Sequence, residues 1–153
     1  MKVGINGFGR IGRLVFRIAI KDPAVEVVAV NDIADPQTLA HLLKYDSTYG
    51  ILDADVKATE SAIVVNGKEY KVLAVRSPEE LPWKSLGVEY VVESTGLFRS
   101  KDKAAGHIKA GAKKVVDLMD APPTSMATST CSPVWTSAIN SPASLKLLLN
   151  GLI

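Results

Sequence analysis

The chain has 153 residues, which is long enough for one domain. Its formal net charge is only +2, which argues against nucleic acid as a partner. One cysteine, Cys131, excludes an internal disulfide, and two separated histidines, His41 and His107, offer no metal-ligand cluster, so we expect no metal site. Charges and glycines interrupt the apolar start, so we expect no signal peptide and no membrane span, with a cytoplasmic location as the default.

The first 32 residues combine two apolar strands, one helix and a glycine motif. Residues 2–6 predict a short buried strand, 10–20 an amphipathic helix, and 25–31 a second strand that ends just before Asp32. Between the first strand and the helix the chain reads Gly7-Phe8-Gly9-Arg10-Ile11-Gly12. Glycines at this spacing, between a strand and a helix, are typical of a dinucleotide-binding site.

Each glycine of this motif has a separate physical role. Gly7 allows a tight turn, Gly9 leaves room for a pyrophosphate, and Gly12 lets the helix pack closely on the strand. The helix that begins near Arg10 directs unpaired amide N–H groups at the phosphates, and Asp32 accepts hydrogen bonds from a ribose. A carboxylate would repel the 2'-phosphate of NADP, and neither neighbour of Asp32 is an arginine, so the pattern favours NAD.

The next segment predicts a helix and then antiparallel strands. Asp35 and Pro36 start a helix that runs to about Leu43, with proline where its missing N–H costs little. Residues 57–75 contain strand-like runs around Asn66-Gly67, a two-residue hairpin turn. We therefore expect an antiparallel hairpin inserted in an otherwise parallel arrangement.

Strands and helices continue to alternate after the hairpin. The pattern predicts a helix start at Ser77–Glu80, a buried strand at Val88–Glu93, a helix at Lys101–Ala110 stopped by Gly111, and a strand at Lys113–Val116. This order predicts an α/β fold, namely a Rossmann-like, doubly wound, mostly parallel sheet with an inserted antiparallel hairpin. The ligand crevice of such a sheet lies at the carboxyl ends of its strands.

The chain changes character after Asp120. Residues 121–153 form a Ser/Thr/Pro-rich tail in which Lys146 is the only charged residue. We expect a loop or disorder through about Ser141 and a short apolar helix at 142–153. The expected organisation is therefore a cofactor-binding domain over 1–120 followed by the tail.

Residues 1–116 resemble the amino-terminal, NAD-binding portion of phosphorylating glyceraldehyde-3-phosphate dehydrogenases. The resemblance is carried by the glycine motif and by four further segments, namely Val30-Asn31-Asp32, Leu43 to Gly50, Glu93 to Phe98, and Ala105 to Val116. It implies NAD as the cofactor, with the pyrophosphate on the amides of Arg10 and Ile11 and Arg76 beside the adenine. The expected site residues are Asn6, Gly7, Gly9, Arg10, Ile11, Gly12, Asn31, Asp32, Arg76, Ser94, Thr95, Gly96 and Phe98, of which Ser94 to Gly96 and Phe98 line the nicotinamide side.

The resemblance stops at Val116. Positions 117 and 118 are Asp and Leu, where the family has a segment whose serine contacts the cofactor. The family's nucleophilic cysteine segment, catalytic histidine and phosphate-binding residues have no counterpart. Cys131 lacks the expected neighbours, and Pro133 removes an N–H that an oxyanion site would use, so we expect no catalytic residue in this sequence. A deletion, a frameshift or a chimera would each explain the tail.

The resemblance implies that the chain is the NAD-binding domain of a glyceraldehyde-3-phosphate dehydrogenase-like oxidoreductase. Enzymes of this family act in glycolysis. We expect it to be inactive alone and to act on a small sugar phosphate only if a catalytic domain is supplied. The alternatives are a non-catalytic nucleotide-binding module and a non-functional truncated gene product. Within the enzyme class, erythrose-4-phosphate dehydrogenase is a related runner-up. An apolar face left exposed without the catalytic domain would favour self-association.

Overall fold

The computed structural model describes residues 1–97 and 101–117, with side chains described for 1–97 and 105–116. Its strands are β1 (Lys2–Asn6), β2 (Glu26–Asn31), β3 (Tyr45–Asp46), β4 (Gly50–Ile51), β5 (Val56–Ala58), β6 (Ala62–Val65), β7 (Lys68–Leu73), β8 (Tyr90–Glu93) and β9 (Lys114–Asp117). Its helices are α1 (Arg10–Ala19), α2 (Pro36–Lys44), α3 (Trp83–Leu86) and α4 (Lys101–Lys109), with a 3-10 turn η1 (Pro78–Glu80). Phe98, Cys131 and the helix expected at 142–153 lie outside the described residues.

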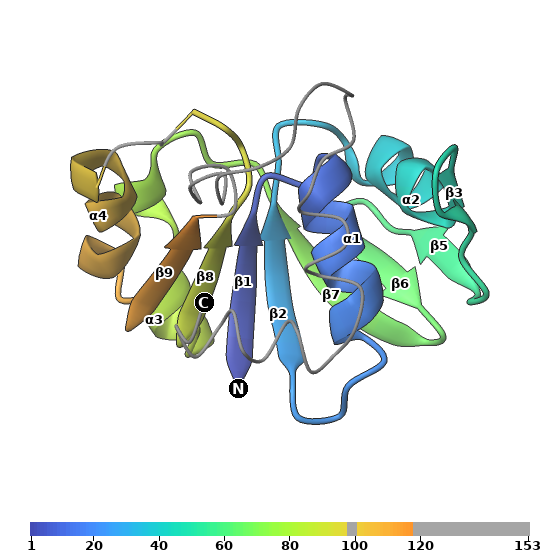
Figure 1. Ribbon diagram of the computed structural model, residues 1–153, viewed down its shortest axis with the longest axis horizontal. Coiled ribbons are helices and arrows are strands. Elements are labelled where there is room, and N and C mark those ends of the chain that lie inside the picture. Colours follow the sequence, from blue (N-terminus) through green and yellow to red (C-terminus); the bar gives the residue numbers. More distant parts are fainter. Residues whose placement is uncertain (98–100, 118–153) are drawn as a thin grey trace, which may run out of the picture.

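The main sheet has the strand order β5-β6-β7-β2-β1-β8-β9. Neighbouring strands from β7 to β9 are parallel, whereas β5 and β6 pair in antiparallel fashion at one edge. In Figure 1 the arrowheads of β1, β2, β8 and β9 all point to the upper edge of the sheet, where the loop from β1 to α1 also lies. The prediction of a Rossmann-like, doubly wound, mostly parallel sheet with an antiparallel hairpin is confirmed.

The hairpin turn explains how the antiparallel edge forms. Asn66 and Gly67 both have positive φ, 51° and 81°, as a two-residue turn between β6 and β7 requires. β7 then pairs in parallel with β2, so the hairpin extends the sheet at its edge and leaves the parallel centre intact. The short β3 and β4 pair separately with each other.

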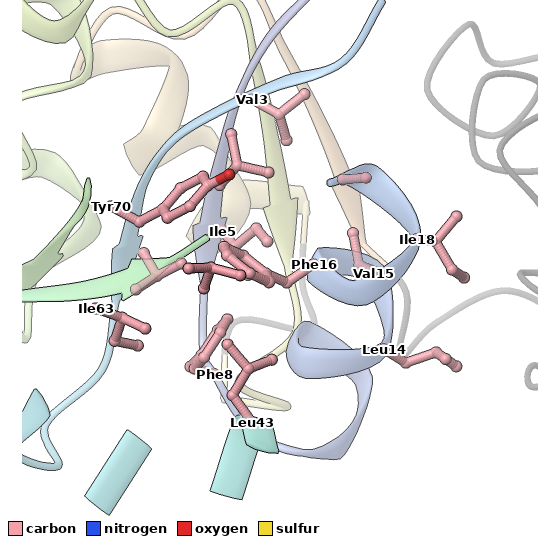
Figure 2. Packing of buried hydrophobic residues seen from close by; sticks show 14 of the residues in the cluster. Val3, Ile5, Phe8, Leu14, Val15, Phe16, Ile18, Leu43, Ile63 and Tyr70 are labelled. Carbon is pink, nitrogen blue, oxygen red and sulfur yellow. The ribbon is translucent and has the colours of Figure 1, made fainter. Parts of the chain in front are cut away.

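One face of the sheet is covered by α1 (Figures 1 and 2). Successive strand residues point to opposite faces, so Val3 and Ile5 of β1 both point toward this helix. Phe16 of α1 is fully buried and meets Phe8 and Tyr70 edge-on, with ring centroids 5.4 and 4.8 Å apart. These contacts pack α1 against the loop that follows β1 and against β7.

The opposite face packs around Trp83 of α3, which is fully buried. A Cβ at Gly4 of β1 would lie 2.8 Å from the indole ring, so only glycine lets the ring lie against the strand. The remaining buried members of this cluster are Ala29, Leu81, Val88, Val91 and Ala112. The two clusters together fix the central strands from both sides.

The structure corrects two boundaries of the sequence-based interpretation. The helix expected from Ser77 is only the single turn η1, because Leu81 before Pro82 is extended and proline cannot continue a helix. The strand expected from Val88 begins at Tyr90, because the Val88 N–H donates back to the Trp83 carbonyl at 2.9 Å. No helix within the described ranges is long and apolar enough to cross a membrane.

Candidate dinucleotide site

A crevice of about 400 Å³ opens at the carboxyl ends of the central strands. β1 lies between β2 and β8, so the chain continues to one side of β1 after the first helix and later to the other side. Open α/β sheets bind ligands at this point, where the strand order reverses direction. Its lining residues come from the ends of β1, β2, β7 and β8 and are Asn6, Gly7, Gly9, Asn31, Asp32, Ile33, Val75, Arg76, Ser94, Thr95 and Leu97. Most of the expected site residues are therefore brought together here.

The loop after β1 is packed tightly against the end of β8. Gly7 has a φ of +89°, and a Cβ there would lie 2.7 Å from the Thr95 backbone nitrogen. At Gly12 a Cβ would overlap the carbonyl oxygen of Gly7 and lie 3.1 Å from the Ser94 hydroxyl oxygen. Side chains at these two positions would push α1 away from the sheet.

The start of α1 is open toward the crevice. The first amide N–H groups of a helix have no partner within it, and Gly9 before α1 supplies no side-chain hydrogen bond to them. A Cβ at Gly9 would meet no atom within 4 Å, and the first turn contains no acidic residue. The amides of Arg10 and Ile11 thus stand at the positive end of the helix beside open space, which suits an anionic group.

Asp32 connects the glycine loop to the end of β2. One carboxylate oxygen accepts from the Phe8 N–H at 2.7 Å, and the other accepts from the Ala34 N–H at 3.1 Å. On the other side of the loop the Arg13 guanidinium donates to the Phe8 carbonyl at 3.0 Å. Each carboxylate oxygen keeps a second lone pair, so Asp32 can also accept hydrogen bonds from a ligand.

The floor of the crevice is a buried chain of polar side chains. The Asn31 amide donates to the Asn6 side-chain oxygen at 2.7 Å and exchanges hydrogen bonds with both backbone groups of Val75. The Asn6 amide in turn donates to Glu93 at 2.6 Å. The carboxyl ends of four neighbouring strands are thereby joined by side chains.

Glu93 is the last residue in this series of hydrogen-bonded side chains, and the sequence analysis did not assign it a role. Its carboxylate also accepts hydrogen bonds from the Thr95 N–H at 2.8 Å and from the Thr95 hydroxyl. The ring nitrogen Nε2 of His107 lies 2.9 Å from the same carboxylate. Burial alone would raise the pKa of Glu93, but the hydrogen bonds donated by His107, Thr95 and Asn6 favour the charged form more strongly and hold the pKa below its ordinary value. A carboxylate at the end of an otherwise apolar strand is the sequence signal that could have identified it.

Ser94 and Arg76 also line the crevice, whereas Gly96 lies outside its lining. Ser94 is buried and its hydroxyl donates to the Asn6 and Gly7 carbonyls, so it braces the glycine loop from below. Arg76 is exposed at the rim, and Gly96 follows Thr95 without being part of the lining. Three apolar lining residues were missed: Val75, which is partly buried, and Ile33 and Leu97, which are 76% and 70% exposed. The exposed apolar surface of Ile33 and Leu97 is available to pack against a flat ring.

Part of this sequence is similar to known proteins. Residues 1–101 match the family model described as glyceraldehyde 3-phosphate dehydrogenase, NAD binding domain. The glyceraldehyde-3-phosphate dehydrogenase of Geobacillus stearothermophilus is 62% identical over 116 residues, which are 76% of this chain and 35% of that protein. Those of Thermotoga maritima and Clostridium pasteurianum are 57% identical over 117 residues and 56% identical over 115 residues, which are 75% of this chain and 35% and 34% of the relatives.

The chain therefore spans about a third of the length of these relatives. The matched part includes the glycine loop, Asp32, and the ends of β7 and β8, which together form the crevice. The family model covers well over half of the chain. The chain belongs to the family of glyceraldehyde 3-phosphate dehydrogenase NAD-binding domains, and NAD is the cofactor of that domain.

Proposed function

We propose that NAD lies in the crevice with its pyrophosphate on the amides of Arg10 and Ile11 and its adenosine ribose on Asp32. Arg76 lies beside the adenine, and Thr95 lies on the nicotinamide side. The full proposed site is Asn6, Gly7, Gly9, Arg10, Ile11, Gly12, Asn31, Asp32, Arg76, Ser94, Thr95, Gly96 and Phe98. The observation that carries the proposal is the open space above Gly9, directly beside the uncapped positive end of α1.

The chain acts in this proposal as the cofactor-binding part of a glyceraldehyde-3-phosphate dehydrogenase-like oxidoreductase. Bound NAD supplies a hydride acceptor, while the protein groups bind and orient it. Action on a small sugar phosphate requires the catalytic part of the relatives, so we expect these 153 residues to bind NAD without turnover. The division into a domain at 1–120 and a tail at 121–153, and the cytoplasmic location, are parts of the same proposal.

A non-catalytic nucleotide-binding module is the second candidate. It is favoured by the position of the crevice, which lies wholly within the third of the relatives' length that this chain matches.

Self-association through exposed apolar side chains such as Tyr45 and Ile51 is expected whether the chain acts as part of a dehydrogenase or as a nucleotide-binding module. A concentration series in sedimentation would detect it as a mass that rises with concentration, whereas a constant monomer mass would exclude it.

Calorimetric titration of the purified chain with NAD, NADP and ATP tests the proposed function. We expect saturable binding that prefers NAD, with no turnover of glyceraldehyde-3-phosphate. Saturable binding of ATP with an affinity equal to that of NAD would favour the module. No heat with any of the three ligands, from a sample with a cooperative melting transition, would overturn the proposal.

Asp32→Asn is expected to weaken NAD binding by about tenfold and to reduce the preference for NAD over NADP. Hydrogen bonds to a charged acceptor are about twice as strong as neutral ones, and the substitution also removes the repulsion of the 2'-phosphate. The same titrations measure both affinities. Asp35→Asn is the matched control, because Asp35 is an exposed N-cap of α2 and asparagine caps equally well. An unchanged ratio of the NAD and NADP affinities in Asp32→Asn would contradict the assigned role of Asp32.

A further inference from the structure

His107 of α4 is a fully buried histidine whose Nε2 lies 3.3 Å from the side-chain nitrogen of Asn6, a residue that lines the crevice. Its Nδ1 lies 3.0 Å from the indole Nε1 of Trp83, and its Nε2 lies 2.9 Å from a carboxylate oxygen of Glu93. Trp83, His107 and Glu93 are fully or almost fully buried, so no solvent replaces these contacts. The sequence analysis considered this histidine only as a metal ligand and assigned it no role at the site.

The partners of His107 determine which nitrogen carries the proton. An indole N–H is a donor only, so Nδ1 must accept from Trp83 and therefore carries no hydrogen. The hydrogen of the neutral ring then lies on Nε2, which donates to Glu93, and the Asn6 amide nitrogen 3.3 Å away donates to the same carboxylate at 2.6 Å and not to the ring. Trp83 thus holds the imidazole in one tautomer and aims its N–H at the carboxylate.

The carboxylate of Glu93 in turn orients the polar lining of the crevice. It accepts from the Asn6 amide and from both the N–H and the hydroxyl of Thr95, and Asn6 accepts from Asn31. Loss of one hydrogen-bond donor raises the free energy of a buried carboxylate, which must then rotate, bind water or take up a proton. Any of these changes would move Asn6 and Thr95, which line the crevice.

We propose that His107 is a positioning residue of the NAD site, which acts through Glu93 on the orientation of Asn6 and Thr95. The inference rests on the proposed function, because it assigns a role in NAD binding to a residue outside the crevice lining. It also gives α4 a function at the site, since this helix follows β8 along the chain and returns to the end of that strand through His107. Trp83 completes the arrangement by selecting the tautomer.

The test compares His107→Leu with His107→Gln in NAD titrations. Leucine removes the donor to Glu93, and we expect NAD to bind at least about tenfold more weakly. The Nε2 of glutamine can take the place of the ring Nε2 and donate to Glu93, so this variant should bind within about threefold of the parent chain. Leu81→Ala is the control, because Leu81 is buried in the same apolar cluster as Trp83 and has no polar side-chain group to offer Glu93.

Circular dichroism and the melting temperature check the fold, and amide NMR without NAD gives an independent readout. The Thr95 backbone amide and the Asn6 side-chain amide should shift in His107→Leu and stay near their parent positions in His107→Gln. The inference is overturned if His107→Leu binds NAD within about twofold of the parent chain. It is also overturned if Leu81→Ala weakens binding as much at a similar melting temperature.

Trp83→Phe keeps the test decisive if His107→Leu does not fold. Loss of the indole N–H should convert the single imidazole tautomer, seen by nitrogen NMR, into a mixture and weaken NAD binding by about threefold. An unchanged tautomer with unchanged affinity would contradict the proposal. Absence of NAD binding by the parent chain would instead overturn the proposed function itself, while the Thr95 and Asn6 amide shifts would still show whether His107 orients them.

Discussion

Gly12→Ala is expected to lower the free energy of unfolding by about 3 kcal/mol or more and to abolish NAD binding. The new methyl group would overlap the Gly7 carbonyl oxygen and lie 3.1 Å from the Gly7 carbonyl carbon and the Ser94 hydroxyl oxygen. Backbone atoms cannot move aside as a flexible side chain can, so α1 must shift away from the glycine loop. The amides at the start of α1 then move as well, which couples the loss of stability to the loss of the site.

Denaturant unfolding and the melting temperature measure this effect, and we expect a decrease of roughly 10 °C in the midpoint. Gly9→Ala is the matched control, since its methyl group would meet no atom within 4 Å and the backbone there has an ordinary negative φ. This control should fold like the parent chain, yet it should bind NAD more weakly because its methyl group enters the proposed pyrophosphate position. Equal stability of the two alanine variants would contradict the packing argument.

Arg17→Met is expected to lower the free energy of unfolding by about 3 kcal/mol. Arg17 of α1 is 8% exposed and donates to the Leu43 carbonyl from Nη2 at 2.7 Å and from Nε at 3.2 Å. It also donates to the Gly50 carbonyl at 3.1 Å, which holds the segment after α2. The last carbonyls of a helix lack partners within the helix, so methionine would leave buried acceptors of α2 unsatisfied.

Urea unfolding measures the loss, and Arg10→Met on the same helix is the control. Arg10 is exposed, so the same chemical change there should alter stability by no more than about 0.5 kcal/mol. Circular dichroism should show that Arg17→Met still folds at low temperature. A stability within error of the Arg10→Met variant would mean that the hydrogen bonds of Arg17 to α2 do not stabilise the fold.

The elements around the glycine loop were predictable because their signals are local. The strand at Lys2–Asn6, the glycines at their fixed spacing and the helix that follows occupy one short stretch of chain. The hairpin was equally predictable, because Asn66 and Gly67 together specify a turn that few other pairs adopt. The helix start expected at Ser77 is present, but it leads only to the single turn η1, since Pro82 cannot continue the helix.

The hidden supports of the crevice depend on residues far apart in the chain. His107 meets Trp83 across 24 positions, and the amide of Asn6 meets Glu93 across 87. Arg17 reaches the Leu43 carbonyl across 26 positions. A local pattern can single out one partner, such as the carboxylate at the end of the apolar strand before Ser94, but no local pattern shows which distant residue it will meet.

The fold class, the family and the position of the crevice could all be inferred from the amino-acid sequence, because hydrophobic periodicity, turn residues and glycine spacing act over short distances. The side chains that support the crevice became visible only in the folded chain, since a buried polar group must find its partner wherever the fold places one. Glu93 is the example. Its place at the end of a strand is visible in the sequence, but its donors Asn6, Thr95 and His107 surround it only after β1, β8 and α4 have come together.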